Sequence, residues 1–274
     1  MFAIAQKDDQ YLTYRLTDDT AQSYIEVVPE RGGIITQWGV QGKEMLYLDR
    51  ERFAKPEMSV RGGVPILFPI CGNLPDNTYT LDGQTYSLKQ HGFARTLPWQ
   101  VVDQSTEGRA AMTVALTSSD ETRAVYPFDF RLEFTYGLQG NVLELHQRHI
   151  NQSDKPMPFS TGLHPYFLVT DKSQLSLDIP STEYQDNVHG GTHSFSGQFD
   201  FSKEEIDAAF YPLMAQQTRA TEGDRQLTLQ IDYDANYSTL VFWTVQGKDF
   251  YCLEPWSAGR NAMNTGAHLI HLPP

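Results

Sequence analysis

The chain has 274 residues, of which 40 % are hydrophobic and 20 % are charged, as in ordinary soluble globular proteins with a sizeable core. Its formal net charge of −13 opposes binding to nucleic-acid phosphates and to anionic membranes, so we expect neither as a partner. No apolar run approaches the ~18 residues of a membrane span, and the N-terminus lacks the pattern of a signal peptide.

Cys71 and Cys252 are the only two cysteines in the chain. This low number fits a reduced, cytoplasmic protein and implies no disulfide framework. The sequence contains no CxxC motif and no Cys/His cluster, so we expect neither a zinc site built on the cysteines nor any other metal or cofactor.

Alternation of apolar and polar residues with period two dominates the chain and predicts strands. The predicted strands are residues 23–28, 111–117, 130–138, 142–150 and 226–233, with a more continuous buried strand over 237–243. Residues 81–86 are expected to form a hairpin, because Asp82-Gly83 supplies its turn. Helical periodicity is weak, and residues 202–210 are expected to form one short helix or turn with Ser202 as its N-cap.

The fold class that follows is all-β: a large antiparallel β-sandwich with few short helices. No composition shift, linker or repeat marks a boundary, so we expect one domain over residues 1–274.

Three segments far apart in sequence carry polar residues in apolar and aromatic surroundings. They are residues 89–95 (KQHGFAR), 160–167 (STGLHPYF) and 251–256 (YCLEPW). If they converge, His91, His164 and Glu254 form an acid/base apparatus in one pocket, with Trp256 as one of its walls.

Each of these residues also has a plainer interpretation. An isolated His164 is more often a histidine satisfied by a backbone carbonyl, and His91 could be a loop histidine stacked on an aromatic ring. Glu254 could end a strand and point to solvent, although burying it without a partner is costly. Arg61 and Arg95 could bind phosphate or sugar hydroxyls as guanidinium forks, or could pair with carboxylates in the structure.

The remaining histidines give weaker signals. His146 and His149 are three residues apart in a predicted strand, so they should lie on opposite faces and cannot share a metal. The spacing of His189 and His193 in a glycine-rich loop permits a metal clip, but a solvated loop is favoured. No dinucleotide fingerprint, P-loop or serine-hydrolase motif is present.

Taken in order, the three segments resemble the aldose 1-epimerase (mutarotase) superfamily. Residues 29–33 (PERGG), 46–49 (LYLD), 62–69 (GGVPILFP) and 79–88 (YTLDGQTYSL) fit the same family, so the similarity covers nearly the whole chain. The resemblance implies a galactose-mutarotase-like β-sandwich with a sugar cleft and cofactor-free interconversion of α and β anomers.

The resemblance also implies roles for individual residues. Glu254 matches the general base, His164 the general acid and His91 the second active-site histidine, while Asp207 looks like the substrate-binding aspartate. The general base would take the proton of the C1 hydroxyl and a protonated His164 would protonate the ring oxygen.

One position departs from the family pattern. Galactose mutarotases carry an Asn-Arg-Ile segment with a sugar-binding arginine, and here the matching stretch reads Gly72-Asn73-Leu74, which keeps Asn73 as a candidate for substrate binding. Arg61 and Arg95 instead resemble the phosphate-gripping arginines of the hexose-6-phosphate mutarotase branch.

The sequence therefore predicts an aldose 1-epimerase acting on an aldohexose, with a hexose-6-phosphate mutarotase as the alternative. A non-catalytic carbohydrate-binding module would not need the acid/base pair, and a lyase on the same scaffold would need a further base or metal. We expect a sugar or sugar phosphate as ligand and a monomer or homodimer.

Overall fold

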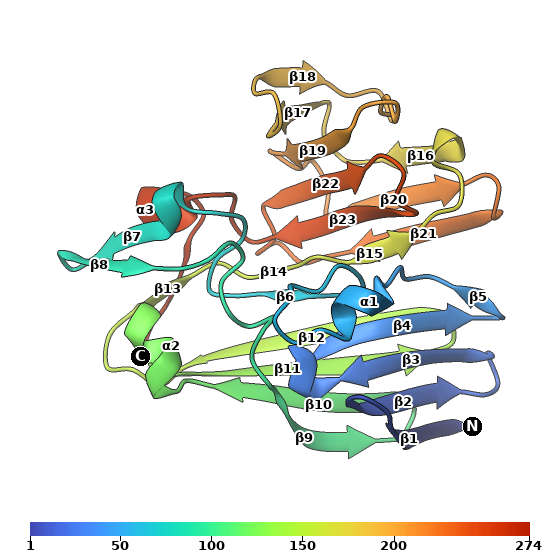
Figure 1. Cartoon of the computed structure of the whole chain (residues 1–274), viewed down its shortest axis with the longest axis horizontal. Helices are drawn as coiled ribbons and strands as arrows, with labels where there is room; N and C mark the ends of the chain where they lie inside the picture. Colours follow the sequence, from blue (N-terminus) through green and yellow to red (C-terminus); the bar gives the residue numbers. More distant parts are fainter.

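The computed structural model describes residues 1–274, and antiparallel strands dominate it (Figure 1). The three α-helices are each short: α1 (Arg50–Phe53), α2 (Asp120–Val125) and α3 (Ala262–Thr265). Three 3₁₀ turns are η1 (Pro29–Arg31), η2 (Pro75–Asn77) and η3 (Lys172–Gln174). The predicted all-β class with few short helices is confirmed. None of the helices combines the length and the apolar character that crossing a bilayer requires.

Two antiparallel sheets face each other in the lower half of Figure 1. The first has the order β1 (Phe2–Asp8), β2 (Leu12–Asp18), β3 (Ser23–Val28), β4 (Ile34–Val40) and β5 (Lys43–Glu44). The second has the order β12 (Val142–Asn151), β11 (Phe130–Gln139), β10 (Ala110–Thr117) and β9 (Gln100–Ser105). Inward residues such as Leu16, Ile25 and Phe134 are fully buried, because alternate side chains of each strand turn to the shared interior.

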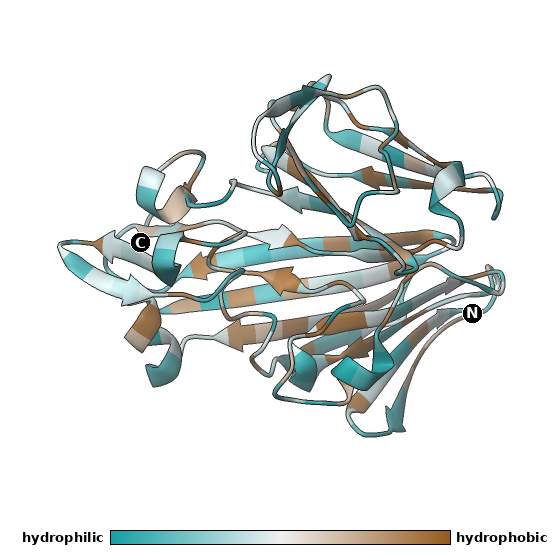
Figure 2. Cartoon of the chain, turned by 45° about the horizontal axis from the view of Figure 1, so that its top comes forward, coloured by the Kyte–Doolittle hydropathy of each residue, from teal (hydrophilic) through white to brown (hydrophobic).

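A third sheet forms the upper half and carries the candidate site (Figure 1). Its order is β18 (Thr192–Ser194), β17 (Glu183–Asp186), β19 (Glu205–Phe210), β22 (Thr239–Val245), β23 (Phe250–Trp256), β14 (Gly162–Leu163) and β6 (Ile66–Leu67), and β15 (Tyr166–Leu168) also pairs with β23. Smaller sheets complete the fold: β16 (Leu175–Asp178) with β20 (Gln217–Glu222) and β21 (Leu227–Asp232), β7 (Thr78–Leu81) with β8 (Gln84–Ser87), and β13 (Met157–Phe159) with β24 (Ile270–Leu272). Figure 2 shows hydrophilic and hydrophobic residues alternating along many of these strands, which is the pattern that predicted them.

Arg225 joins the first sheet to the third. It donates hydrogen bonds to the carbonyl oxygens of Leu168 (2.6 Å) and Glu44 (2.5 Å), and to the carboxylate of Glu222 (3.0 Å). Tyr251 donates to the same carboxylate at 3.1 Å. This partly buried arginine therefore fixes β15 and β23 relative to β5, and with them the sheet that carries the site.

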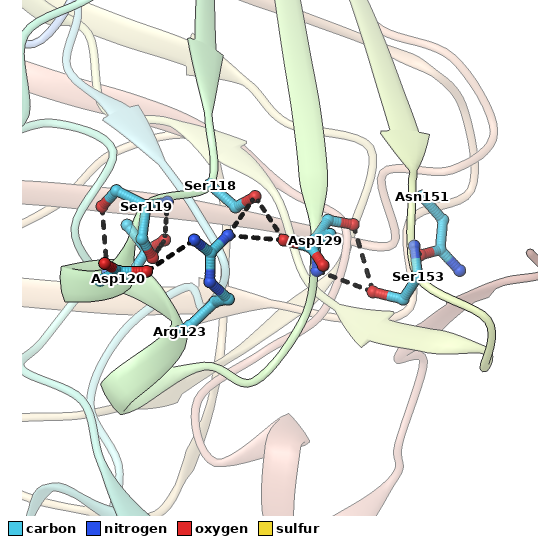
Figure 3. Close-up of polar contacts among 8 residues, drawn as sticks. Ser118, Ser119, Asp120, Arg123, Asp129, Asn151 and Ser153 are labelled. Carbon is cyan, nitrogen blue, oxygen red and sulfur yellow. Dashed lines mark hydrogen bonds and ion pairs between the residues drawn. The ribbon is translucent and has the colours of Figure 1, made fainter.

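A second polar network fixes the connection between β10 and β11 (Figure 3). Ser119 caps α2, since its Oγ accepts from the Thr122 N–H while Thr122 Oγ1 accepts from the Ser119 N–H. Arg123 reaches from the last turn of α2 to Asp129 at 2.6 Å, and the Asp129 N–H donates to Ser153. Figure 3 shows these bonds joining α2, the start of β11 and the turn after β12, so they stabilise the scaffold.

The predicted hairpin over residues 81–86 is confirmed, with Asp82 (φ 51°) and Gly83 (φ 79°) both in the left-handed region of a type I′ turn. The predicted opposite orientation of His146 and His149 is also confirmed. His146 is exposed, whereas His149 stacks on Phe159 at 4.8 Å and burial lowers its pKa to about 4.

The expectation of a short helix over residues 202–210 was wrong, because residues 205–210 form strand β19 and only the preceding residues turn. The alternation of buried Ile206, Ala208 and Phe210 with less buried neighbours is the signal that the acidic residues of this segment obscured. The correction places Asp207 on the sheet that carries the other site residues.

Candidate active site

The floor of the site is the hairpin of β22 and β23. Val241 lies opposite Glu254 and Trp243 opposite Cys252 in its register. Because side chains alternate along a strand, Cys252 and Glu254 turn to the same face of the sheet. Glu254 is only 1 % exposed, so its carboxyl group lies in an environment that disfavours charge.

His164 reaches the same point from the loop between β14 and β15. Its backbone N–H donates to the carbonyl oxygen of Pro65 at 3.0 Å, and its ring stacks on Tyr166 with centroids 4.7 Å apart. These contacts hold Nε2 of His164 at 3.3 Å from Oε1 of Glu254. The structure therefore brings an imidazole and a carboxyl group into direct contact in a buried position.

His91 completes the group and is held in a left-handed backbone conformation, with φ 67°. Its backbone N–H donates to Gly72 O at 2.7 Å, and the Gly72 N–H donates to its Nδ1 at 3.0 Å. Since Nδ1 accepts a hydrogen bond, the ring proton of neutral His91 sits on Nε2. The rings of His91 and His164 meet edge-on with centroids 5.4 Å apart.

Trp256 lies beneath this group rather than on the surface of a cleft, since it is 1 % exposed. Its indole N–H donates to Oε2 of Glu254 at 3.1 Å, and its ring contacts His91. Trp256 was expected as a wall of the pocket, and here its hydrogen bond orients the carboxyl group of Glu254.

Asp207 approaches from the neighbouring strand β19, opposite Trp243. Its Oδ2 accepts a hydrogen bond from Arg260 at 2.5 Å, and the same guanidinium donates to Oδ1 of the exposed Asn73 at 2.8 Å. Arg260 thus ties together two of the predicted substrate-binding residues.

Sequence reasoning missed Arg260. It lies in a loop after β23 whose residues show no motif, and only the fold brings it to Asp207. Leu74, where the galactose mutarotase pattern has an arginine, is buried in the core and offers nothing to the site. Arg260 supplies a guanidinium group next to Asp207 and Asn73 instead, and the aliphatic part of its side chain packs over Gly72.

Arg61 and Arg95 both lie near Tyr166, whose ring stacks on His164. Arg61 is exposed, with its guanidinium 5.9 Å from the Trp243 ring centroid, and forms no side-chain hydrogen bond or ion pair. Arg95 donates one bond to Gln90 O at 2.9 Å, and its buried Nε has no partner. Neither arginine forms an ion pair with a carboxylate of the protein.

The surroundings shift the pKa values of the central pair in opposite directions. Burial, and then the charge of Asp207, raise the pKa of Glu254 well above its ordinary value. Burial, and then the charge of Arg95, lower the pKa of His164 to about 3. Burial likewise lowers the pKa of His91 well below 6.5. Both shifts favour a pair that holds a single proton, and the lowered pKa of His91 favours its neutral, donating form.

The other sequence candidates lie elsewhere. Both are exposed: His189 lies in the turn between β17 and β18 and pairs with Asp186 at 3.4 Å, and His193 lies in β18. A cavity of about 160 Å³ adjoins Asp207, lined in part by Tyr184 and Asp186. A cavity of about 580 Å³ next to the turn between β22 and β23 contains none of the candidate residues.

Comparisons with known proteins bear on the family and the fold. The family model described as "Aldose 1-epimerase" matches residues 14–271. A curated protein of Cenchrus ciliaris, "Putative glucose-6-phosphate 1-epimerase", is 29 % identical over 168 residues, covering 57 % of this chain and 48 % of that protein. The match thus spans about half the length of that curated relative.

Among solved structures, the Slr1438 protein from Synechocystis sp. PCC 6803 is 46 % identical, with a TM-score of 0.95, over 100 % of this chain and 95 % of that one. A galactose mutarotase-like protein from Clostridium acetobutylicum is 19 % identical with a TM-score of 0.84, over 100 % of this chain and 95 % of that one, and shares the fold. The expected galactose-mutarotase-like architecture is confirmed.

Proposed function

Because the chain belongs to the aldose 1-epimerase family, we propose that it interconverts the α and β anomers of an aldohexose by proton transfer through Glu254 and His164. The observation that carries this proposal is the 3.3 Å contact between His164 Nε2 and Glu254 Oε1 in a buried position. A module that only binds sugar needs no acid/base pair, and burying one without a function would cost stability.

The reaction begins with the shared proton of the pair on Nε2 of His164, so that the carboxylate of Glu254 can take the proton of the C1 hydroxyl. The electron pair of that O–H bond forms the aldehyde C=O, the bond between C1 and the ring oxygen breaks, and Nε2–H of His164 protonates the ring oxygen. Rotation about C1–C2 presents the other face of the aldehyde. Closure returns both protons along the same paths, so the sugar alone is changed.

The pKa shifts fit this cycle. After ring opening Glu254 is protonated and His164 is neutral, which are the forms that burial favours. The site therefore stabilises the open-chain state. When the ring is closed, Glu254 and His164 are both charged, and the hydroxyl groups of the bound sugar supply the polar partners that these charges need. His91 donates its Nε2–H to a sugar oxygen, because the Gly72 N–H fixes its tautomer.

A phosphorylated aldohexose is the second candidate substrate, and Arg61 and Arg95 favour it. In a protein of net charge −13, two guanidinium groups beside the site without a carboxylate partner are available to an anion. The curated relative named for glucose 6-phosphate supports the same candidate. The free thiols of Cys71 and Cys252 support a reducing location, the cytoplasm.

Polarimetry of freshly dissolved α-D-glucose and α-D-galactose tests the activity, together with NMR exchange spectroscopy of glucose 6-phosphate. We expect the protein to accelerate anomer exchange of at least one of these sugars. Faster exchange of the phosphate ester alone would assign Arg61 and Arg95 to the phosphate. Rates equal to those of buffer for all three sugars would refute the proposed function.

A further inference from the structure

Cys252 lies in the middle of the active-site group and has no part in the proposed proton transfers. It precedes Glu254 by two residues on β23, so its thiol turns to the same face of the sheet. One ligand atom each from His164, Cys252 and Glu254 lie within 4.8 Å of one another. The sequence shows no Cys/His cluster, but the fold builds one.

These three side chains form a metal-binding set of known type. Imidazole nitrogen, thiolate sulfur and carboxylate oxygen are the ligands of Zn²⁺, which binds them at about 2.0–2.3 Å and often keeps a fourth position for water. Bond lengths of that size put neighbouring ligands of a tetrahedral zinc about 3.3–3.6 Å apart. From separations of at most 4.8 Å, the three atoms need to close in by at most about 1.2–1.5 Å, which side-chain rotation can supply.

Burial also suits the site to a cation. Cys252 is 0 % exposed, Glu254 1 % and His164 7 %, so little water competes with these ligands. A dication bound there meets a thiolate and a carboxylate, whose charges offset its own.

We propose that a thiophilic divalent cation, with Zn²⁺ as the best match, binds between His164, Cys252 and Glu254 and inhibits the enzyme. The cation displaces the thiol proton of Cys252 and the shared proton of the acid/base pair, and both protons leave to solvent. Hard cations such as Mg²⁺ are disfavoured, because the thiolate is a soft ligand. Inhibition rests on the proposed function, whereas the site itself does not.

Two arginines limit the affinity. Arg95 and Arg260 are near enough for their charges to act on both His164 and Glu254. Their repulsion opposes the incoming cation, so occupancy should follow the metal concentration and be reversed by a chelator.

The test uses reduced, metal-free full-length protein titrated with Co²⁺, which substitutes for Zn²⁺ and gives a near-ultraviolet absorption band when a thiolate binds it. The variants are Cys252→Ser and, as matched control, Cys71→Ser. Cys71 is equally a buried free thiol, but Ser160 and the backbone of Ser257 already engage it. We expect the band in wild type and in the Cys71 variant, and its loss in Cys252→Ser.

Inhibition provides the second measurement. The Zn²⁺ concentration that halves the rate of anomer exchange, measured against the metal-free rate of the same variant, should rise by at least about 10–100-fold in Cys252→Ser. Should the serine variant fail to fold, Cys252→Ala serves in its place. Absence of the cobalt band in wild type, or a band that survives loss of Cys252, overturns the site. Because the band is read without substrate, this failure is distinct from a failure of the proposed enzyme activity.

Discussion

Nε2 of His164 and Oε1 of Glu254 face each other at 3.3 Å, and burial disfavours the charged form of each. The two groups therefore titrate as one unit whose working state holds a single proton. A second proton removes the base, and loss of the only proton removes the acid. This relationship determines how the rate of anomer exchange depends on pH and how much the buried pair destabilises the folded protein.

The rate should stay nearly constant as pH falls from 7 to about 4. With ordinary pKa values a second proton would reach the pair below about 4.5 and remove the base. Here the pKa of Glu254 is raised, and the second proton must go to His164, whose pKa is lowered to about 3. We expect kcat/KM, corrected for spontaneous anomer exchange, to show no break near 4.5. A tenfold loss per pH unit below 4.5 would contradict the shared-proton state.

Glu254→Gln should lower the rate of catalysed exchange by about 10²–10⁴-fold, the contribution of one positioned acid/base group. The amide keeps the size of the side chain and an oxygen that can accept from Trp256, but it cannot take a proton from the C1 hydroxyl. Sugar binding measured by calorimetry should persist. A variant that exchanges anomers at the wild-type rate would remove Glu254 from the mechanism.

The same substitution should stabilise the protein at neutral pH. Because folding raises the pKa of Glu254, the folded state holds a proton that the unfolded state has released, and stability falls as pH rises above the unfolded pKa of 4.5. The amide side chain of the variant does not titrate and has no such proton to hold. We expect its melting temperature at pH 7.5 to exceed that of wild type by about 2–4 °C, the shift that ~1 kcal/mol produces in a protein of this size.

Below pH 4.5 this difference should vanish, since Glu254 is then protonated in both states. A difference that stays constant from pH 4 to 8 would show that titration of this carboxyl group is not its cause.

Arg61→Gln should separate the two candidate substrates. Loss of a charge-assisted hydrogen bond to phosphate costs about 1.5–3 kcal/mol, which is about 10–150-fold in kcat/KM for glucose 6-phosphate. The rate with free glucose should stay within about twofold. Arg148→Gln is the control, because Arg148 is an exposed arginine on β12, in another sheet. Equal losses with both sugars would mean that Arg61 acts on the site rather than on the phosphate.

Much of this fold was predictable because its strands alternate with period two. Strands such as β10, β11 and β12 and the type I′ hairpin at Asp82-Gly83 follow from local pattern and turn chemistry. The strand β19 was missed because its acidic residues resemble a helix start. This segment forms a strand because it pairs with β22, and that pairing cannot be read from the local sequence pattern.

The candidate site was predictable only in part. His91, His164 and Glu254 were identified because polar residues interrupt apolar segments. Arg260 and the third ligand Cys252 were not identified, because their importance comes from contacts across the fold. The pKa shifts of His164 and Glu254 also depend on burial, which is set by contacts across the fold.

The backbone that presents His91 gives a last prediction, for Gly92→Ala. Gly92 has φ 67°, and a Cβ there would meet the carbonyl oxygen of Phe68 at 2.2 Å. Gly108→Ala is the matched control, since Gly108 has φ 72° and nothing within 4 Å. Both variants bear the cost of the left-handed conformation, about 1–2 kcal/mol, but only Gly92→Ala must also move the backbone beside His91.

We therefore expect a lower melting temperature for Gly92→Ala than for Gly108→Ala, and a loss of activity in the first variant alone. The loss should be about 100-fold, because a shift of ~1 Å breaks the hydrogen bond from the Gly72 N–H to Nδ1 of His91 and with it the orientation of the donor. Melting curves and exchange rates measured side by side decide the matter. Equal melting temperatures and unchanged exchange would mean that the close approach to Phe68 does not position His91.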